Sequence, residues 1–354
     1  MSTIIHRDRK VRPPSFDALS PAVCYPLLTL LFILLGMQGM TFYSFALFSV
    51  FLIAFLLGFR LGRPAGKERY PIVWRLGFPL FLVGAAAEFI NILYINSIPL
   101  LEPAMRSRMM PSLAYISFLI VPGCIILLTD SLLHRRNREA LGWLLAGTFL
   151  ISLLGYRTEI YALLLGASMS AYYLKGGGIS KGTAVKYIAA FAAVALAINI
   201  GVVMFREMPV ESFADRFALT TNVFSSIADN YGLTVFGETG GVIHMSILSS
   251  LRVIPGPRTG PRTFISQLIG MGAGSTTPTI IGLPFVDFGI AGVLIAGILL
   301  GLLFGSGYKT LRRGDIDILP LHALCMAFLI LTIETGIADT IVLIYLIAYL
   351  VMVL

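Results

Sequence analysis

Charged residues are scarce in this chain. Asp, Glu, Lys and Arg make up 12% of its 354 residues, whereas a typical soluble domain carries about 25%. Hydrophobic residues reach 57%, and the mean hydropathy is +0.88. This balance excludes both a water-soluble globular protein and a disordered chain. We therefore predict a protein that is embedded in a membrane.

Cysteine and histidine are also rare, with 3 and 4 residues respectively. Cys24, Cys124 and Cys325 lie far apart in apolar runs, so they provide neither a disulfide framework nor the spacing of metal ligands. The sequence has no HExxH, CxxC or G-x-S-x-G motif. The glycines of 270–274 are followed by no lysine that would complete a phosphate loop. We predict no metal site and no cofactor.

Long apolar runs, by contrast, are abundant. A helix needs about 20 apolar residues to cross the ~30 Å hydrocarbon layer of a bilayer, and about ten runs approach that length. We predict an all-α fold, a polytopic transmembrane helical bundle that forms a single integral membrane domain over residues 1–354. The spans are expected near residues 22–38, 41–59, 76–95, 112–130, 141–155, 159–174, 186–204, 286–307, 318–334 and 338–354.

The positive charges alternate along the predicted connections. Of the 26 Lys and Arg residues, 18 fall in every second connection, and the positive-inside rule places those connections in the cytoplasm. Both termini are then cytoplasmic, and the net charge of +8 reflects topology in the cytoplasmic membrane rather than a nucleic-acid partner. The 18 residues are Arg7, Arg9, Lys10, Arg12, Arg60, Arg63, Lys67, Arg69, Arg75, Arg135, Arg136, Arg138, Lys175, Lys181, Lys186, Lys309, Arg312 and Arg313.

The remaining eight cations fall in connections assigned to the outer face, and all of them are arginine although the chain has 6 lysines. The planar guanidinium group suits bidentate binding of phosphate, so the bias indicates an anionic ligand outside. Snorkelling of arginine side chains at helix ends is the alternative explanation, above all for Arg106 and Arg108. The eight are Arg106, Arg108, Arg157, Arg206, Arg216, Arg252, Arg258 and Arg262.

Residues 205–285 form one long extracytoplasmic connection. The connection opens with a charged amphipathic stretch from Arg206 to Arg216, which predicts a helix on the membrane surface. Glycine and proline then interrupt short apolar pieces. Irregular backbone at membrane depth is tolerated only where protein or a water-filled cavity covers it. We therefore expect interfacial or re-entrant helices that line an active-site cleft.

Few side chains near this connection can exchange a proton. His244 lies between Glu238 and Arg252, and a histidine, with an ordinary pKa near 6.5, accepts protons at neutral pH. Asp287 stands where the connection enters the next span, and a carboxylate there is expected to cap the N-terminus of that helix. The alternative for His244 is a loop histidine whose hydrogen bonds are purely structural. The alternative for Asp287 is a helix cap without a catalytic role.

Three features together resemble the oligosaccharide repeat-unit polymerases, the family that includes the O-antigen polymerases and is related to the O-antigen ligases. One is the long outer connection with spaced arginines. The others are a short outer turn and a helix entry, with the sequences Gly155-Tyr156-Arg157-Thr158-Glu159 and Asp287-Phe288-Gly289-x-x-Gly292. The resemblance implies a multi-span membrane glycosyltransferase of the C type, with a polyprenyl-diphosphate-linked donor and neither metal nor nucleotide sugar.

The resemblance also implies roles for residues. The donor diphosphate would be surrounded by arginines, and a base would deprotonate the attacking sugar hydroxyl, with His244 first and Glu238 and Asp287 behind it. The expected partners are a polyprenyl-diphosphate-linked oligosaccharide, membrane lipid, and a flippase or chain-length regulator, with no nucleic acid. The implied phosphate-binding residues are Arg157, Arg206, Arg216, Arg252 and Arg258.

Three alternatives stay open. The chain has one large outer connection rather than two with matching arginine motifs, which leaves ligase-like transfer to another acceptor as a reading. Glu88 and Glu334 lie deep in predicted spans, where acidic residues often couple ions, so a lipid-glycan or ion-coupled transporter is the second. Transporters usually show two related halves, whereas no internal repeat is apparent in this sequence. The third is an assembly subunit without activity.

Overall fold

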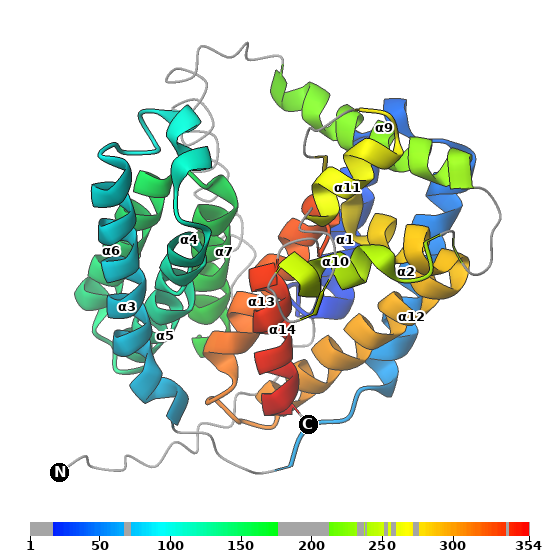
Figure 1. Cartoon of the computed structure of the whole chain (residues 1–354). Helices are drawn as coiled ribbons and strands as arrows, with labels where there is room; N and C mark the ends of the chain where they lie inside the picture. Colours follow the sequence, from blue (N-terminus) through cyan, green and yellow to red (C-terminus); the bar gives the residue numbers. More distant parts are fainter. Residues whose placement is uncertain are drawn as a thin grey trace.

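The computed structural model describes residues 17–66, 72–175, 212–231, 237, 239–250, 254–255, 260–271, 276–337 and 340–353. Every regular element in these ranges is helical (Figure 1). The helices are α1 (Pro21–Leu35), α2 (Phe42–Leu61), α3 (Ile72–Ile95), α4 (Pro111–Ser117), α5 (Ile120–Leu133), α6 (Asn137–Leu154), α7 (Arg157–Leu174), α9 (Ser212–Tyr231), α10 (Val242–Ser250), α11 (Pro261–Leu268), α12 (Thr279–Arg312), α13 (Leu319–Thr335) and α14 (Thr340–Val353), with short 3₁₀ helices η1 (Met37–Gly39) and η2 (Pro103–Arg108).

The predicted spans coincide with these helices, except for 186–204, which lies outside the described residues. Four helical stretches are long and apolar enough to cross a membrane, namely Phe42–Leu61, Val73–Ile95, Pro111–Leu133 and Thr279–Arg312. Shorter apolar helices run over Pro21–Leu35, Leu319–Thr335 and Ile341–Val353. The all-helical membrane fold is confirmed, and the number of about ten spans stays a prediction.

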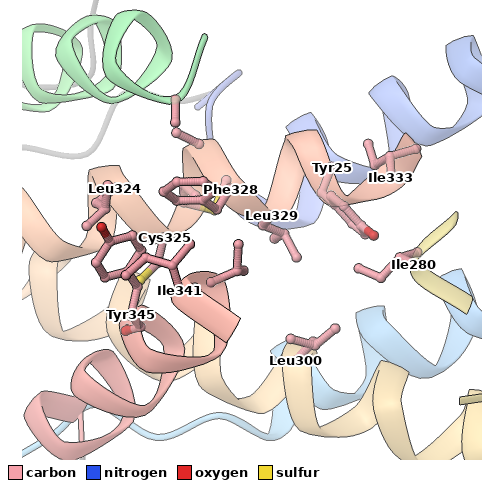
Figure 2. Packing of buried hydrophobic residues seen from close by; sticks show 14 of the residues in the cluster. Tyr25, Ile280, Leu300, Leu324, Cys325, Phe328, Leu329, Ile333, Ile341 and Tyr345 are labelled. Carbon is pink, nitrogen blue, oxygen red and sulfur yellow. Dashed lines mark hydrogen bonds between the residues drawn. The ribbon is translucent and has the colours of Figure 1, made fainter. Parts of the chain in front are cut away.

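Helix α13 holds the molecule together. It packs against α5 and α7 on one side and against α1, α12 and α14 on the other, so it joins the two groups of helices seen in Figure 1. Most of its residues are apolar, and 13 of the 17 are buried, as expected for a helix at the centre of a membrane bundle. Phe328 and Cys325 of α13 face Tyr345 and Ile341 of α14 (Figure 2).

Helices α2 and α12 are in direct backbone contact. The sequence Gly297-x-x-x-Gly301-x-x-x-Gly305 predicts a ridge of small residues for close helix packing, and the structure confirms it. A Cβ atom added at Gly301 would lie 2.1 Å from the carbonyl oxygen of Phe55. From the other helix, a Cβ atom added at Gly58 would lie 2.2 Å from the carbonyl oxygen of Ile298.

Replacing Gly301 by leucine is therefore expected to force α2 and α12 apart and to lower the free energy of unfolding by about 3 kcal/mol. Thermal unfolding of the purified protein in detergent measures the effect. Gly142→Leu is the matched control, because nothing lies within 4 Å of a Cβ atom added there. Equal stability of the two variants would show that the close approach of the helices does not matter.

Connections that are predicted to lie on the same side of the membrane contact one another. At one end, the carboxylate of Asp17 accepts hydrogen bonds from the hydroxyls of Tyr172 and Tyr308, each at 2.7 Å, and from Arg312. Trp74 Nε1 donates to Asp317 at 2.7 Å at the start of α3. All of these contacts join segments that the charge pattern assigns to the cytoplasm.

At the other end, α9 docks on the turn between α1 and α2. Thr221 donates to the carbonyl oxygen of Gly36 at 2.7 Å, and the hydroxyls of Ser225 and Ser44 are 2.8 Å apart. Gly336 lies against Thr279, since an added Cβ atom would be 2.6 Å from its carbonyl oxygen. These segments all belong to connections with a predicted outer position. The contacts agree with alternating helices, and the orientation in the membrane stays a prediction.

Candidate functional site

Helix α10 begins without a capping side chain of its own. Gly240 and Gly241 precede it, so the free N–H groups of its first turn need an acceptor from elsewhere in the chain. Asp287 of α12 supplies it, because Oδ1 accepts from the N–H of Ile243 at 3.0 Å and Oδ2 from the N–H of His244 at 2.8 Å. The expectation that Asp287 caps the helix it belongs to is wrong. It lies within α12 and caps α10, whose positive end attracts the carboxylate.

The same carboxylate holds the imidazole ring of His244. Nδ1 of His244 pairs with Oδ2 of Asp287. The Asp287 side chain is completely buried, whereas that of His244 is 41% exposed. A carboxylate only accepts hydrogen bonds, so we infer that the imidazole carries its proton on Nδ1. Nε2, on the opposite edge of the ring, is left as the basic nitrogen.

Thr239 completes the surroundings of the carboxylate. Its hydroxyl donates to Oδ1 of Asp287, and its N–H donates to the carbonyl oxygen of Val286 at 3.4 Å. Each oxygen of Asp287 thus has two donors, which matches the full accepting capacity of an ionised carboxylate. Gly237 allows this approach, because a Cβ atom added there would lie 2.5 Å from the backbone of Asp287.

A break in α12 presents Asp287 to α10. Gly289 has φ 62° and ψ −150° inside the helix, a conformation that only glycine adopts readily. The helical segment up to Phe288 is therefore set apart from the segment that packs on α2. The sequence placed the start of this span near residue 286, whereas helical structure begins at Thr279.

Phe288 lies beside His244 at the surface. The two rings have centroids 5.5 Å apart and planes tilted by 39°. Phe288 is 40% exposed, although its neighbour Asp287 is fully buried. The exposed imidazole therefore stands next to an exposed aromatic face.

A second group of contacts fixes the turn before Arg157. Gly155 is in the left-handed conformation, with φ 69°, and its carbonyl oxygen accepts a hydrogen bond from the guanidinium group of Arg106. The same guanidinium group stacks 5.2 Å above the centre of the Tyr156 ring. Arg157 is then the first residue of α7, and its side chain is half-buried. Arg106 thus positions the turn that carries a predicted phosphate-binding residue.

The other predicted site residues cannot be compared with this geometry. Glu238, Arg206, Arg252 and Arg258 lie outside the described residues, and Arg216 lies on α9 with its side chain outside them as well. The gathering of arginines around a diphosphate stays a prediction. Within the described ranges, His, Cys, Asp and Glu residues form no group of three or more that could hold a metal ion.

The comparison with known families decides the classification. A family model described as "Putative O-antigen polymerase" matches residues 18–346. The chain belongs to the O-antigen polymerase family. The resemblance inferred from the sequence is confirmed. Membership of the O-antigen polymerase family indicates an integral membrane protein. It also indicates an enzyme of the glycosyltransferase type with a lipid-linked oligosaccharide as substrate.

One curated relative of this O-antigen polymerase family member is an uncharacterized protein of Methanocaldococcus jannaschii. The two chains are 27% identical over 303 residues, which covers 83% of this chain and 82% of the relative. No solved structure matches the chain.

The sequence of this O-antigen polymerase family member does not reveal the roles of two residues in the site. Thr239 and Arg106 act through contacts with partners 48 and 49 residues away in the chain, which no local pattern shows. The link between His244 and Asp287 had a signal, because a helix that starts after two glycines requires a cap from another segment.

Proposed function

We propose that this member of the O-antigen polymerase family lengthens a glycan on the outer face of the cytoplasmic membrane, with both termini in the cytoplasm. It transfers the growing chain from a polyprenyl-diphosphate donor to a new lipid-linked repeat unit. The observation that carries the proposal is the half-exposed imidazole of His244, held at Nδ1 by the buried carboxylate of Asp287. A flippase that delivers the repeat units, or a chain-length regulator, is the proposed protein partner.

In the proposed step, Nε2 of His244 takes the proton of the acceptor hydroxyl. The hydroxyl oxygen attacks the anomeric carbon of the donor, and the bond from that carbon to the diphosphate oxygen breaks. The electron pair leaves with the polyprenyl diphosphate, and the configuration at the anomeric carbon is inverted. Asp287 touches no substrate in this scheme. As a positioning residue, it keeps Nε2 basic and stabilises the imidazolium that forms.

The departing diphosphate needs compensation for its negative charge. Guanidinium groups in a cleft with little water supply it most effectively, because their fork geometry matches phosphate oxygens. We assign this task to Arg157, which follows the turn held by Arg106. The arginines of the long outer connection, Arg206, Arg216, Arg252 and Arg258, are proposed to act with it.

Arg157→Ala is expected to slow polymerisation about 10²-fold, because one donor to the developing negative charge is lost. Arg157→Lys keeps the positive charge but loses the forked guanidinium group, so its polymerisation rate is expected to lie between those of the wild type and Arg157→Ala. Gel analysis of cell-surface glycan length and product formation by the purified protein measure the effect. Arg138→Ala, at an exposed position at the start of α6, is the control. Equal activity of Arg157→Ala and Arg138→Ala would remove Arg157 from the site.

The direct test uses purified protein in detergent with the lipid-diphosphate oligosaccharides that accumulate in cells lacking it. Longer lipid-linked products and released polyprenyl diphosphate support polymerisation. Transfer only to another added acceptor indicates ligase-like activity instead. If neither product forms with well-folded protein, the proposed function is wrong.

One observation keeps the transporter alternative in view. Glu88 of α3 is completely buried, and neither of its carboxyl oxygens has a hydrogen-bond partner among the described residues. A buried acidic side chain within a membrane span is a typical ion-coupling group in membrane proteins. The detergent assay separates the two functions, because a transporter has no second compartment to serve in a micelle.

A further inference from the structure

Phe288 has a surface position that its surroundings do not explain as packing. It stands between Asp287 and Gly289, both of which are buried, yet it is itself 40% exposed. Its ring lies beside the imidazole ring of His244, whose side chain is 41% exposed. The ring is thus partly exposed directly beside the candidate base.

Two glycines hold the ring in this place. A Cβ atom added at Gly241, where φ is +97°, would lie 3.2 Å from Cζ of Phe288. A Cβ atom added at Gly292 would lie 2.7 Å from the Cβ atom of Phe288. Backbone therefore passes close to both the tip and the base of the side chain. The position of the ring is set by the chain around it, as expected for a preformed binding surface.

We propose that Phe288 is the platform on which the acceptor sugar ring stacks, an inference that rests on the proposed function. A pyranose ring has an apolar face of C–H groups and an edge of hydroxyls. Stacking of the apolar face on an aromatic ring buries it and leaves the hydroxyls at the edge. His244 lies next to the Phe288 ring, with the ring centroids 5.5 Å apart and the planes tilted by 39°.

The acceptor, rather than the donor, fits this place because of the proton. The group that reacts with Nε2 of His244 is the hydroxyl of the acceptor, so the acceptor sugar must lie next to the imidazole. A sugar held by its face also has its reacting hydroxyl oriented, which reduces the entropy lost on reaching the transition state. Phe288 thus binds and aligns the nucleophile, and the arginines bind the leaving group.

Binding of free sugar tests this inference without requiring turnover. The probe is the oligosaccharide released by mild acid from the lipid-linked pool of cells lacking the protein, and saturation-transfer NMR with the purified protein gives its Kd. Phe288→Leu is expected to raise Kd about five- to tenfold, because leucine offers no aromatic face. Phe288→Tyr is expected to bind like the wild type. Phe89→Leu is the control, since Phe89 is 51% exposed on α3.

Wild-type Kd in Phe288→Leu, with an unchanged unfolding temperature, would overturn the platform. If that variant does not fold, Phe288→Met replaces it, with the same expectation and the same contrary result. The outcome for the proposed function is read separately. Loss of transfer in His244→Ala together with unchanged sugar binding in Phe288→Leu rejects only the platform. Normal transfer in His244→Ala together with weakened binding in Phe288→Leu rejects the proposed base and retains a sugar site.

Discussion

His244→Ala loses polymerisation by a factor of about 10²–10⁴, the usual contribution of a general base. One nitrogen of the imidazole is held by the buried Asp287, and the side chain is 41% exposed. In the proposed mechanism, its removal leaves the acceptor hydroxyl without a proton acceptor. The unfolding temperature is expected to change little, because the ring is not part of the core. The rate of product formation by purified protein measures the effect.

The chain offers a closely matched control for this variant. His134 at the end of α5 is 43% exposed, and its Nδ1 lies 3.4 Å from the carboxylate of Asp130. It is thus another exposed histidine beside an aspartate, in a connection predicted to be cytoplasmic. His134→Ala should retain full activity. Comparable rates in His134→Ala and His244→Ala would exclude His244 as the base.

Asp287→Asn is expected to lower the rate by about 10²–10⁴, although asparagine has nearly the same shape. An asparagine amide N–H that faces Nδ1 of His244 donates a hydrogen bond to it, which favours the tautomer with the imidazole proton on Nε2. The nitrogen that should act as base is then blocked. Stability should fall by only about 1 kcal/mol, because the amide oxygen still accepts one of the two N–H groups at the start of α10.

Two controls separate positioning from simple destabilisation. Asp317→Asn removes another buried carboxylate, which accepts from Trp74, and should affect stability without affecting the rate. The double variant His244→Ala, Asp287→Asn should be no slower than His244→Ala alone, because Asp287 acts through the imidazole. Additive losses in rate would mean that Asp287 contributes independently of His244.

The helices and one helix contact could be predicted from the sequence because their signals are local. Apolar runs define where a span forms, and the spacing of Gly297, Gly301 and Gly305 defines a face that packs closely. The arrangement of α13 could not be predicted in this way. Buried residues lie on every side of this helix, so the sequence contains no apolar stripe that shows which face meets which neighbour.

The site could be predicted as candidate residues but not as a constellation. The chemistry of His244 and Asp287 marks both as candidates, yet they are 43 residues apart, and their pairing depends on the backbone turn at Gly289. The sequence allows Arg106 to be a snorkelling residue, whereas in the structure it holds the turn before Arg157. In each case a distant partner decides the role, and single-residue chemistry does not reveal distant partners.

The break at Gly289 divides α12 into two parts that pack against different helices. The part after it is fused to α2 along glycines that admit no side chain, and so it serves as a rigid foundation. The part before it bears Asp287 and Phe288, whose side chains contact residues of α10. Substitutions before Gly289 can therefore change the surface beside α10 while the packing of α12 on α2 is retained.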